Sequence, residues 1–434
     1  MNNSLLRPAP LAQTAAGLRS GQTDLLGYIN RLCDHIDAVE PKVQALLPEP
    51  DRRARLLSEA QELLRRYPEA NERPILFGIP IGVKDIFQAD GFETRAGSKL
   101  PPAALAGPEA DSVALLRAAG ALVLGKTVTT EFAFFEPGPT RNPHNLAHTP
   151  GGSSSGSAAA VAAGITPLAL GTQTIGSVIR PAAFCGIVGF KPTYNRIPPE
   201  GLLFFSRSAD HVGLFTQDVA GMQLAASVTC ADWQPYLAAG KPVLGVPAGP
   251  YLAQASDEAL AAFEEQVMRL AGAGYVVIRQ PLFPDIDEIN RRHRALIAYE
   301  FAQEQAQWFA EYEDLYRPRT AALIREGQQV DPAEAADIRD MQPVLREEVE
   351  HVMDVHDIDL WICPAAPGPA PEGIGSTGDP VMNLPWTYLG LPAVTLPAGF
   401  TRNGLPLGLQ MVGKWMEDEK LLGWAEKIET EMGR

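Results

Sequence analysis

The chain has 434 residues, 46% of them hydrophobic, and a formal net charge of −16. The length allows a large buried core, and the acidic balance disfavours a nucleic-acid partner because phosphate binding needs a basic surface or patch. No run of about 18 uncharged apolar residues or signal-peptide pattern occurs and the four cysteines lack CxxC spacing, so we expect a soluble cytoplasmic protein without a membrane anchor, zinc site or disulfide framework.

Two amphipathic helices are expected in the N-terminal part of the chain. Apolar residues recur at three- and four-residue steps over residues 23–38, and a second helical segment occupies residues 51–66. We therefore assign residues 1–70 to a helical segment that packs on the core. Residues 71–434 are expected to form one large domain.

Beyond residue 75 the sequence changes to short apolar runs bounded by glycine and proline, with helical stretches such as 111–119 and 257–272 between them. This alternation predicts an α/β fold, a single large domain with a central mixed β-sheet covered on both faces by helices. The expected strands lie at 79–83, 121–124, 167–170, 243–246, 275–278, 391–397 and 407–412. Residues at about 285–355 are charged and mostly helical in pattern, which predicts a helical excursion beside the sheet.

Two glycine-flanked hydroxyl clusters follow a lone lysine. Residues 151–157 read Gly-Gly-Ser-Ser-Ser-Gly-Ser, residues 171–177 read Gly-Thr-Gln-Thr-Ile-Gly-Ser, and Lys84 lies upstream in Ile-Gly-Val-Lys-Asp. Because glycine permits positive φ and close backbone approach, the clusters indicate amide N–H groups gathered around a serine nucleophile, with the lysine as its base. A lone lysine would be interpreted as a surface residue at a strand end, and the two clusters favour the catalytic interpretation.

Three other patterns match known motifs and are disfavoured by their context. Residues 120–127 fit the phosphate-loop pattern G-x4-G-K-T, but its four variable residues form an apolar strand of their own. Residues 152–156 fit the G-x-S-x-G nucleophile elbow with Ser154 at its centre, but proline and polar residues precede it where a buried strand is needed. His144 and His148 are four residues apart beside a proline, so loop hydrogen bonding is expected there rather than a metal site.

The lysine and the two clusters resemble those of the amidase signature family, hydrolases that use a serine nucleophile, a second serine held by a cis peptide bond, and a lysine. The resemblance extends from about residue 75 to residue 413 and includes the segments 180–186, 189–193 and 406–410. It implies that residues 71–434 form an amidase catalytic domain. It also implies that the helical excursion helps to wall the substrate pocket.

The resemblance implies a role for each residue of the site. Ser177 is the nucleophile, Ser153 passes the proton, and Lys84 is the base, which burial must keep uncharged near neutral pH. The oxyanion hole consists of the backbone N–H groups of Thr174, Ile175, Gly176 and Ser177. Three further residues are expected to bind substrate: Arg180, Gly152 and Ser154.

Several positions depart from the family pattern or need a separate interpretation. Gln173 and Ile175 stand where the family commonly has aspartate and glycine, and Ile179 stands where many relatives carry an arginine. Gln173 removes a charge and keeps hydrogen-bonding capacity, whereas Ile175 requires ordinary backbone angles and narrows the pocket. Arg180 either holds a substrate carboxylate or carbonyl or pairs with a protein carboxylate. Asp210, in a Ser-x-Asp-x-x-Gly segment, is expected to be structural.

We therefore expect an amidase that cleaves a linear C–N amide bond of a small molecule through an acyl-enzyme on Ser177, with no cofactor and no metal ion. A carbamate (urethane), aryl-amide or ester hydrolase with the same triad is an alternative. The amidase subunit of a tRNA-dependent amidotransferase is a less favoured one, because residues 173, 175 and 179 depart from the pattern. The expected partner is a small-molecule amide or carbamate substrate. We expect no binding to nucleic acid or to a membrane, and the sequence is compatible with a homodimer.

Overall fold

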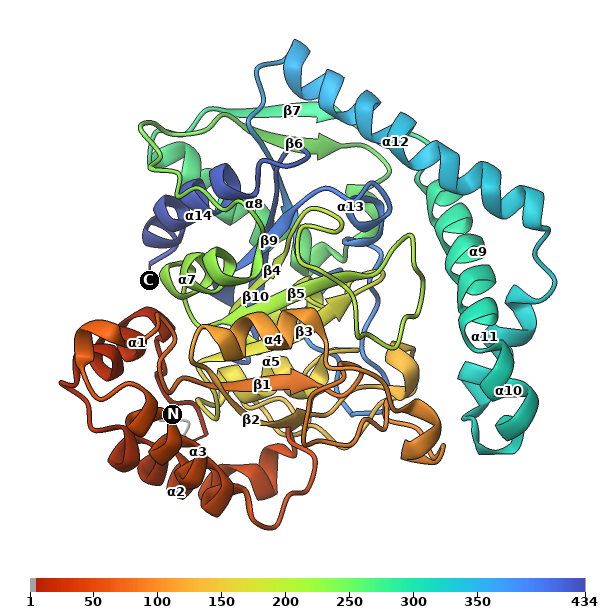
Figure 1. Cartoon of the computed structure of the whole chain (residues 1–434). Coiled ribbons are helices and arrows are strands. Elements are labelled where there is room, and N and C mark those ends of the chain that lie inside the picture. The colour runs from red at the N-terminus through yellow and green to blue at the C-terminus, as the bar shows by residue number, and fades with distance from the viewer. Residues whose placement is uncertain (1–4, 434) are drawn as a thin grey trace.

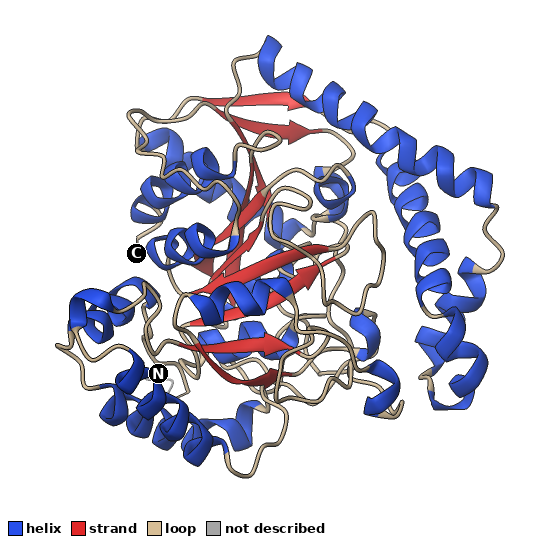
Figure 2. Cartoon of the chain, in the orientation of Figure 1, coloured by secondary structure: helices blue, strands red, loops and turns tan. Residues whose placement is uncertain are grey.

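The strands lie side by side in a single sheet that runs through the middle of the molecule, with helices outside it (Figures 1 and 2). The computed structural model describes residues 5–433, and within them the sheet has ten strands in the order β2-β1-β3-β5-β4-β9-β10-β8-β6-β7. The strands are β1 (Pro80–Lys84), β2 (Leu122–Thr127), β3 (Leu168–Gln173), β4 (Val188–Lys191), β5 (His211–Thr216), β6 (Leu244–Ala248), β7 (Val277–Pro281), β8 (Leu360–Pro364), β9 (Ala393–Phe400) and β10 (Pro406–Val412).

The sheet is mixed, as predicted. Strands β2, β1 and β3 are parallel to one another, the pairs from β3 through β8 are antiparallel, and β8, β6 and β7 are parallel again. Parallel strands end at the same edge of a sheet. The carboxyl ends of β1 and β3, at Lys84 and Gln173, therefore lie close together.

Helices cover both faces of this sheet, which confirms the predicted fold class. In β3 the side chain of Ala169 packs with α5 and α6, while its neighbours Leu168 and Leu170 belong to the main core with residues of α7 and α14. This alternation follows from the two-residue period of a strand. The helices are α1 (Leu11–Ser20), α2 (Leu25–Val43), α3 (Arg52–Arg66), α4 (Asp111–Ala118), α5 (Ser155–Ala162), α6 (Ile179–Cys185), α7 (Val219–Thr229), α8 (Asp257–Gly272), α9 (Ile286–Glu304), α10 (Ala306–Tyr312), α11 (Pro318–Gly327), α12 (Pro332–Val355), α13 (Leu384–Tyr388) and α14 (Asp418–Glu431).

The N-terminal helices differ in part from their predicted extents. Helix α3 agrees closely with the predicted 51–66, but α2 continues to Val43 rather than ending near residue 38. The helix continues because Val39 and Val43 extend its buried apolar stripe. Pro41 has no N–H group to donate, but it lies in the last turn, so its effect is confined to the end of the helix. Because these helices share the core of the sheet, the domain boundary at residue 70 stays a prediction.

Helices α9 to α12 run along one side of the molecule, beyond the strands (Figure 1). They reach the loop 131–133 through aromatic contacts: the ring of Phe132 stacks on Trp308 and on Tyr316, with ring centroids 6.1 and 5.4 Å apart. Phe132 has a φ of 45°, a value that a bulky residue keeps only where its surroundings impose it. The helical excursion thereby holds the segment that leads into Phe134 and Phe135.

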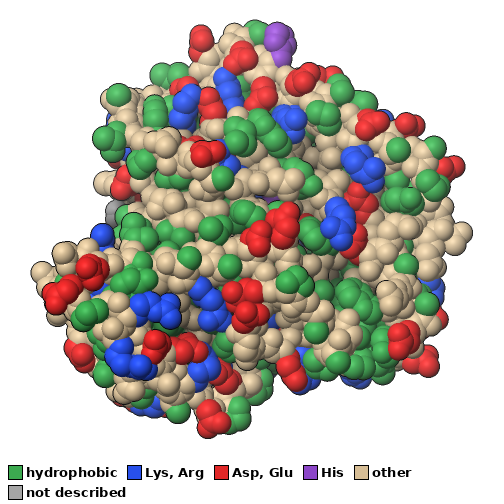
Figure 3. Space-filling view, viewed as in Figure 1, with side chains coloured by type: hydrophobic (Ala, Val, Ile, Leu, Met, Phe, Trp, Pro, Cys, Tyr) green, Lys and Arg blue, Asp and Glu red, His purple; other side chains and the backbone are tan. Residues whose placement is uncertain are grey.

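The surface carries charges of both signs. On the face shown in Figure 3, basic side chains are interspersed with acidic ones. Within residues 5–433, no helix is both long enough and apolar enough to cross a lipid bilayer.

Candidate active site

Lys84, the last residue of β1, is fully buried. Its Nζ lies 2.8 Å from Ser153 Oγ and 2.7 Å from Thr172 Oγ1. Burial lowers the pKa of Lys84 to about 7, although the charge of Asp210 acts in the opposite direction. At neutral pH the amine is therefore uncharged in about half of the molecules, and it lies in hydrogen-bonding distance of a serine hydroxyl.

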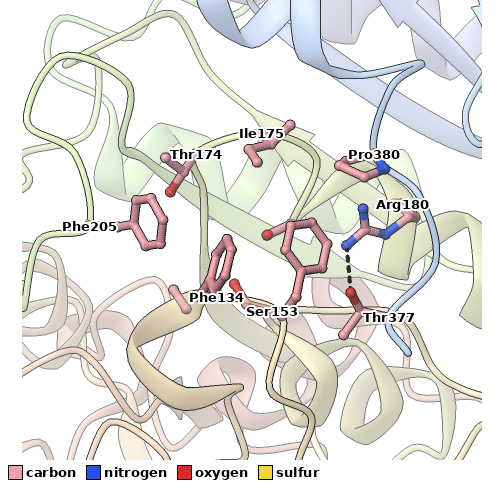
Figure 4. Close-up of a pocket in the computed structure, with 11 residues that line it drawn as sticks. Phe134, Ser153, Thr174, Ile175, Arg180, Phe205, Thr377 and Pro380 are labelled. Carbon is pink, nitrogen blue, oxygen red and sulfur yellow. Dashed lines mark hydrogen bonds between the residues drawn. The ribbon is translucent and has the colours of Figure 1, made fainter. Parts of the chain in front are cut away.

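Ser153 and Ser177 line the same cavity. Thr174 and Ile175 line it as well, and Figure 4 shows these two residues together with Ser153. The Gly152–Ser153 peptide bond is cis, and the Ser153 carbonyl accepts a hydrogen bond from Thr130 N. Among the hydrogen bonds of the residues described, none joins Ser177 Oγ to Ser153. Catalytic hydrogen bonds often shorten only when substrate is bound, so a contact between the two serines stays a prediction.

The loop 174–177 connects β3 to α6, and Gln173 fixes both of its ends. The Gln173 Oε1 accepts hydrogen bonds from Val178 N at 2.8 Å and Ile179 N at 3.0 Å, which caps the start of α6. Its Nε2 donates to Thr387 Oγ1 at 2.9 Å. The glutamine thus supplies the hydrogen bonds expected from its amide, without the charge of an aspartate.

Ile175 has no positive φ, unlike nine other non-glycine residues of the described chain, and its side chain lines the cavity. Both findings agree with the interpretation of a β-branched residue at this position. The remaining apolar lining comes mainly from aromatic rings, those of Phe134, Phe135 and Phe205. No local pattern marks these three residues, because they come from two loops that meet only in the folded chain.

Arg180 is buried at the same cavity, with 1% of its surface exposed. Its Nη2 donates to Gly152 O at 2.6 Å and to Thr377 Oγ1 at 3.2 Å (Figure 4). Within residues 5–433, Arg180 forms no ion pair with a carboxylate, and its Nε and Nη1 have no hydrogen-bond partner. Burial lowers the pKa of Arg180 to about 10, and the charge of Asp379 partly opposes this. The predicted alternative, an ion pair with a buried protein carboxylate, is therefore wrong.

The two other residues expected to bind substrate are placed differently. The Gly152 carbonyl is occupied by Arg180, and a Cβ on Gly152 would come within 2.7 Å of Thr377 Cγ2. Ser154 is fully buried outside the cavity lining, and its Oγ is bound to the backbone N and O of Thr172 at 3.3 and 3.2 Å. The structure does not bring Ser154 to the cavity, because its side chain is turned toward β3.

Asp210 is a buried carboxylate that binds the loop 174–177. Its carboxylate accepts hydrogen bonds from Thr174 Oγ1 and from the backbone N of Phe205 and Ser206. Burial raises the pKa of Asp210 to about 6. The residue therefore links the loop 174–177 to the segment that carries Phe205, which agrees with the expected structural role.

The motifs that the sequence disfavours have ordinary roles. Residues 122–127 form β2, and Lys126 forms a buried ion pair with Asp85 at 3.0 Å. His144 Nε2 lies 2.9 Å from Cys185 O, and His148 Nδ1 lies 2.8 Å from Ala370 O. The predicted loop hydrogen bonding of both histidines is confirmed.

The fold and the family match define the class of protein, which is that of the amidase-signature amidohydrolases. The chain belongs to the amidase family: the family model described as Amidase matches residues 28–422. This confirms the resemblance to the amidase signature family that the lysine and the two glycine-flanked clusters indicated.

Similar proteins include both amidotransferase subunits and amidases. The chain is 33% identical to a glutamyl-tRNA(Gln) amidotransferase subunit of Roseiflexus castenholzii, over 95% of this chain and 93% of that protein. Its sequence is 30% identical to that of an amidase with a known crystal structure. The two structures match with a TM-score of 0.89 over 98% of this chain and 100% of that one. A peptide amidase from Stenotrophomonas maltophilia gives a TM-score of 0.81 at 26% identity, over 98% and 97% of the two chains.

Proposed function

We propose that this protein hydrolyses the C–N bond of a small amide through an acyl-enzyme on Ser177, with Ser153 and Lys84 carrying the proton. The observation that supports this most directly is the position of Lys84 Nζ, 2.8 Å from Ser153 Oγ in a fully buried place that lowers the pKa of the amine to about 7. An ordinary lysine has a pKa near 10.4 and would be charged, and a charged amine cannot accept a proton.

Acylation begins with attack of Ser177 Oγ on the substrate carbonyl carbon. The proton of Ser177 passes to Ser153 Oγ, while the proton of Ser153 passes to the lone pair of Lys84 Nζ. The amine meanwhile donates to Thr172 Oγ1, which lies 2.7 Å away and orients the lone pair toward Ser153. The carbonyl oxygen becomes an oxyanion, which the backbone N–H groups of residues 174–177 stabilise.

Collapse of the tetrahedral intermediate breaks the C–N bond. The proton returns from Lys84 through Ser153 to the leaving nitrogen, which departs as ammonia or an amine. Water then attacks the acyl carbonyl, and the same two groups take up its proton and return one to Ser177. The cycle ends with a carboxylic acid and the free enzyme.

The cavity lining favours an aromatic or otherwise apolar substrate group beside one polar group. Phe134, Phe135 and Phe205 offer ring faces and edges, which suit an aryl amide or an aryl carbamate. Two nitrogens of Arg180, Nε and Nη1, have no hydrogen-bond partner in the described chain, whereas Nη2 is bound to Gly152 O and Thr377 Oγ1. These donors suit a substrate carboxylate or carbonyl oxygen.

The test of the function is the activity of the purified chain alone. We expect it to hydrolyse at least one member of a panel of aliphatic amides, aryl amides, aryl carbamates and carboxylate-bearing amides, without any second protein. Release of ammonia or amine is measured beside a Lys84→Ala blank. Absence of activity on the whole panel, with the same purified sample correctly folded, contradicts the proposal.

A second candidate function is that of an amidase component in an amidotransferase. The identity of 33% to an amidotransferase subunit over nearly the whole of both chains favours it. In that case the chain releases ammonia from glutamine only in the presence of partner proteins. The same panel, extended with glutamine and run with the chain alone, distinguishes the two functions.

Arg180→Lys is expected to raise KM for a carboxylate-bearing amide and to leave KM for a neutral amide of similar size unchanged. The Nε and Nη1 donors stand at fixed positions on the planar guanidinium, whereas the ammonium of lysine is a point charge on a flexible stem and does not reproduce them. The expected loss is about 1.5–3 kcal/mol, the contribution of a charge-assisted hydrogen bond. The measurement is KM for both substrates in wild type and variant.

The alternative role of Arg180 is to hold the Gly152 backbone. Loss of that contact would change both substrates alike and lower the melting temperature, since Nη2 donates to Gly152 O at 2.6 Å. An equal change for the charged and the neutral amide therefore contradicts substrate anchoring and leaves a neutral amide, aryl amide or carbamate as the substrate class.

A further inference from the structure

Two side chains from outside the sheet bind the carbonyl groups of the loop 174–177. His293 Nε2, on α9, lies 2.9 Å from Thr174 O. Thr387 Oγ1, on α13, donates to Ile175 O at 2.6 Å. Both side chains are buried, and neither lines the cavity that contains Ser153 and Ser177. Two successive carbonyls of the loop are therefore turned toward the helices and away from the cavity.

The direction of a carbonyl fixes the direction of the next N–H group. In a planar trans peptide unit the C=O and the following N–H point in opposite directions. The cis bond of the described chain is Gly152–Ser153, so the Thr174–Ile175 and Ile175–Gly176 units are trans. Holding Thr174 O therefore directs Ile175 N–H, and holding Ile175 O directs Gly176 N–H. Among the hydrogen bonds of residues 5–433, neither of these N–H groups donates to another protein group.

The chemistry of His293 matches this task. A carbonyl oxygen only accepts, so Nε2 carries the proton, and burial lowers the pKa of His293 to about 4, which keeps the ring neutral. Nδ1 has no hydrogen-bond partner among the described residues, and the ring meets Tyr388 edge-on with centroids 5.6 Å apart. The contact with Thr174 O is thus the polar contact that the described chain provides for this ring.

Thr387 is oriented by a neighbour in the same way. Its Oγ1 accepts a hydrogen bond from Gln173 Nε2 at 2.9 Å, so its own proton is free to point to Ile175 O. The Asn383 carbonyl lies farther away, at 3.1 Å. Gln173 thereby fixes the end of β3, the start of α6 and the hydroxyl that holds the loop between them.

We propose that His293 and Thr387 are positioning residues that aim the N–H groups of Ile175 and Gly176 at the substrate oxyanion. The inference rests on the proposed function, because it assigns these N–H groups to the oxyanion hole of Ser177. It gives the helical excursion a role in catalysis, because His293 belongs to α9 and binds the carbonyl of Thr174, which lies 119 positions earlier in the chain. Neither side chain touches substrate.

The test uses an alkyl fluorophosphonate, which reacts with an activated serine without knowledge of the natural substrate. Ser177 Oγ forms the bond to phosphorus, fluoride leaves, and the serine proton passes to the Ser153–Lys84 pair. The phosphonyl oxygen occupies the oxyanion hole, so the second-order labelling rate reports the aim of the N–H groups. Amide kcat and KM are measured on the same samples.

Thr387→Val, which removes the hydroxyl at nearly constant volume, is expected to lower kcat and the labelling rate by about 10- to 100-fold with KM unchanged, below the loss for deleting an oxyanion donor outright. His293→Leu is expected to do the same. Thr387→Ser and His293→Gln, which return a donor at the same distance along the side chain, are expected to restore most of the rate. Thr395→Val is the matched control, because its buried hydroxyl has no partner among the described residues.

The outcomes separate the two proposals. If Ser177 is labelled in wild type and both Thr387→Val and His293→Leu keep wild-type rates, the positioning role alone is overturned. A loss of rate that follows the melting temperature, and that serine and glutamine do not restore, also overturns it in favour of simple packing. Absence of labelling at Ser177 in wild type overturns the proposed function and the positioning role together.

Discussion

Ser177→Ala is expected to lower amide turnover by on the order of 10⁶-fold, the loss typical of a serine nucleophile that acts as a unit with its base. Without Oγ there is no acyl-enzyme, and the remaining N–H groups and binding contacts give only residual catalysis. The measurements are steady-state turnover of the best amide in the panel and mass spectrometry of the protein after fluorophosphonate labelling. The label is expected on Ser177 alone.

The control for this experiment is Ser227→Ala, a substitution on the exposed side of α7, which is expected to keep wild-type turnover. The competing nucleophile is Ser154, the centre of the G-x-S-x-G match. Its Oγ is bound to the backbone of Thr172, outside the cavity lining. Label on Ser154, with Ser177→Ala still active, would nevertheless assign catalysis to the nucleophile elbow.

Lys84→Ala is expected to lower kcat/KM for amides by roughly 10²- to 10⁴-fold, the contribution of a general acid–base group. The loss on an activated ester is expected to be much smaller, since its leaving group departs without a proton. Lys84→Met retains the volume of the buried side chain and separates loss of the base from a cavity in the core. Equal losses on amide and ester would contradict the proton-transfer role.

The wild-type pH profile gives an independent check of the same residue. The active form of Lys84 is the uncharged amine, and its pKa is about 7, so the rate is expected to be low below that pH, to rise through it and to level off above. If Lys84 acted in its charged form, the rate would instead fall as the pH rises through this pKa. A rate that is flat across neutral pH, measured at saturating and at low substrate, would contradict the assignment.

Local patterns predicted much of the fold. The strands at 79–83 and 243–246 and the helix at 51–66 are found close to their predicted positions, because short apolar runs and three-to-four-residue periodicity depend only on neighbouring residues. Strands β4, β5 and β8 were not predicted. Like β1 to β3, which were predicted, they are buried on both faces, so a short apolar run is their main local signal, and such a run fits a buried helix segment equally well.

The groups that are proposed to react were also named from the sequence. Lys84, Ser153 and Ser177 stand in segments whose glycines and hydroxyls have a local purpose, and that pattern depends on adjacent residues alone. Their partners have no such signal. Thr377 lies in a loop nearly two hundred residues after Arg180, and Thr387 lies 212 positions after the carbonyl that it binds.

What the sequence determined by itself was therefore the family and the fold class, and it named the side chains that are proposed to react. The tertiary structure decided the state and the surroundings of those side chains: the lowered pKa of Lys84, the unpaired guanidinium nitrogens of Arg180 in the described chain, and the withdrawal of Ser154 from the cavity. The reason is physical. Residue types and spacing fix which groups are present, but desolvation and hydrogen-bond direction depend on which distant segments surround each group, and only packing brings those segments together.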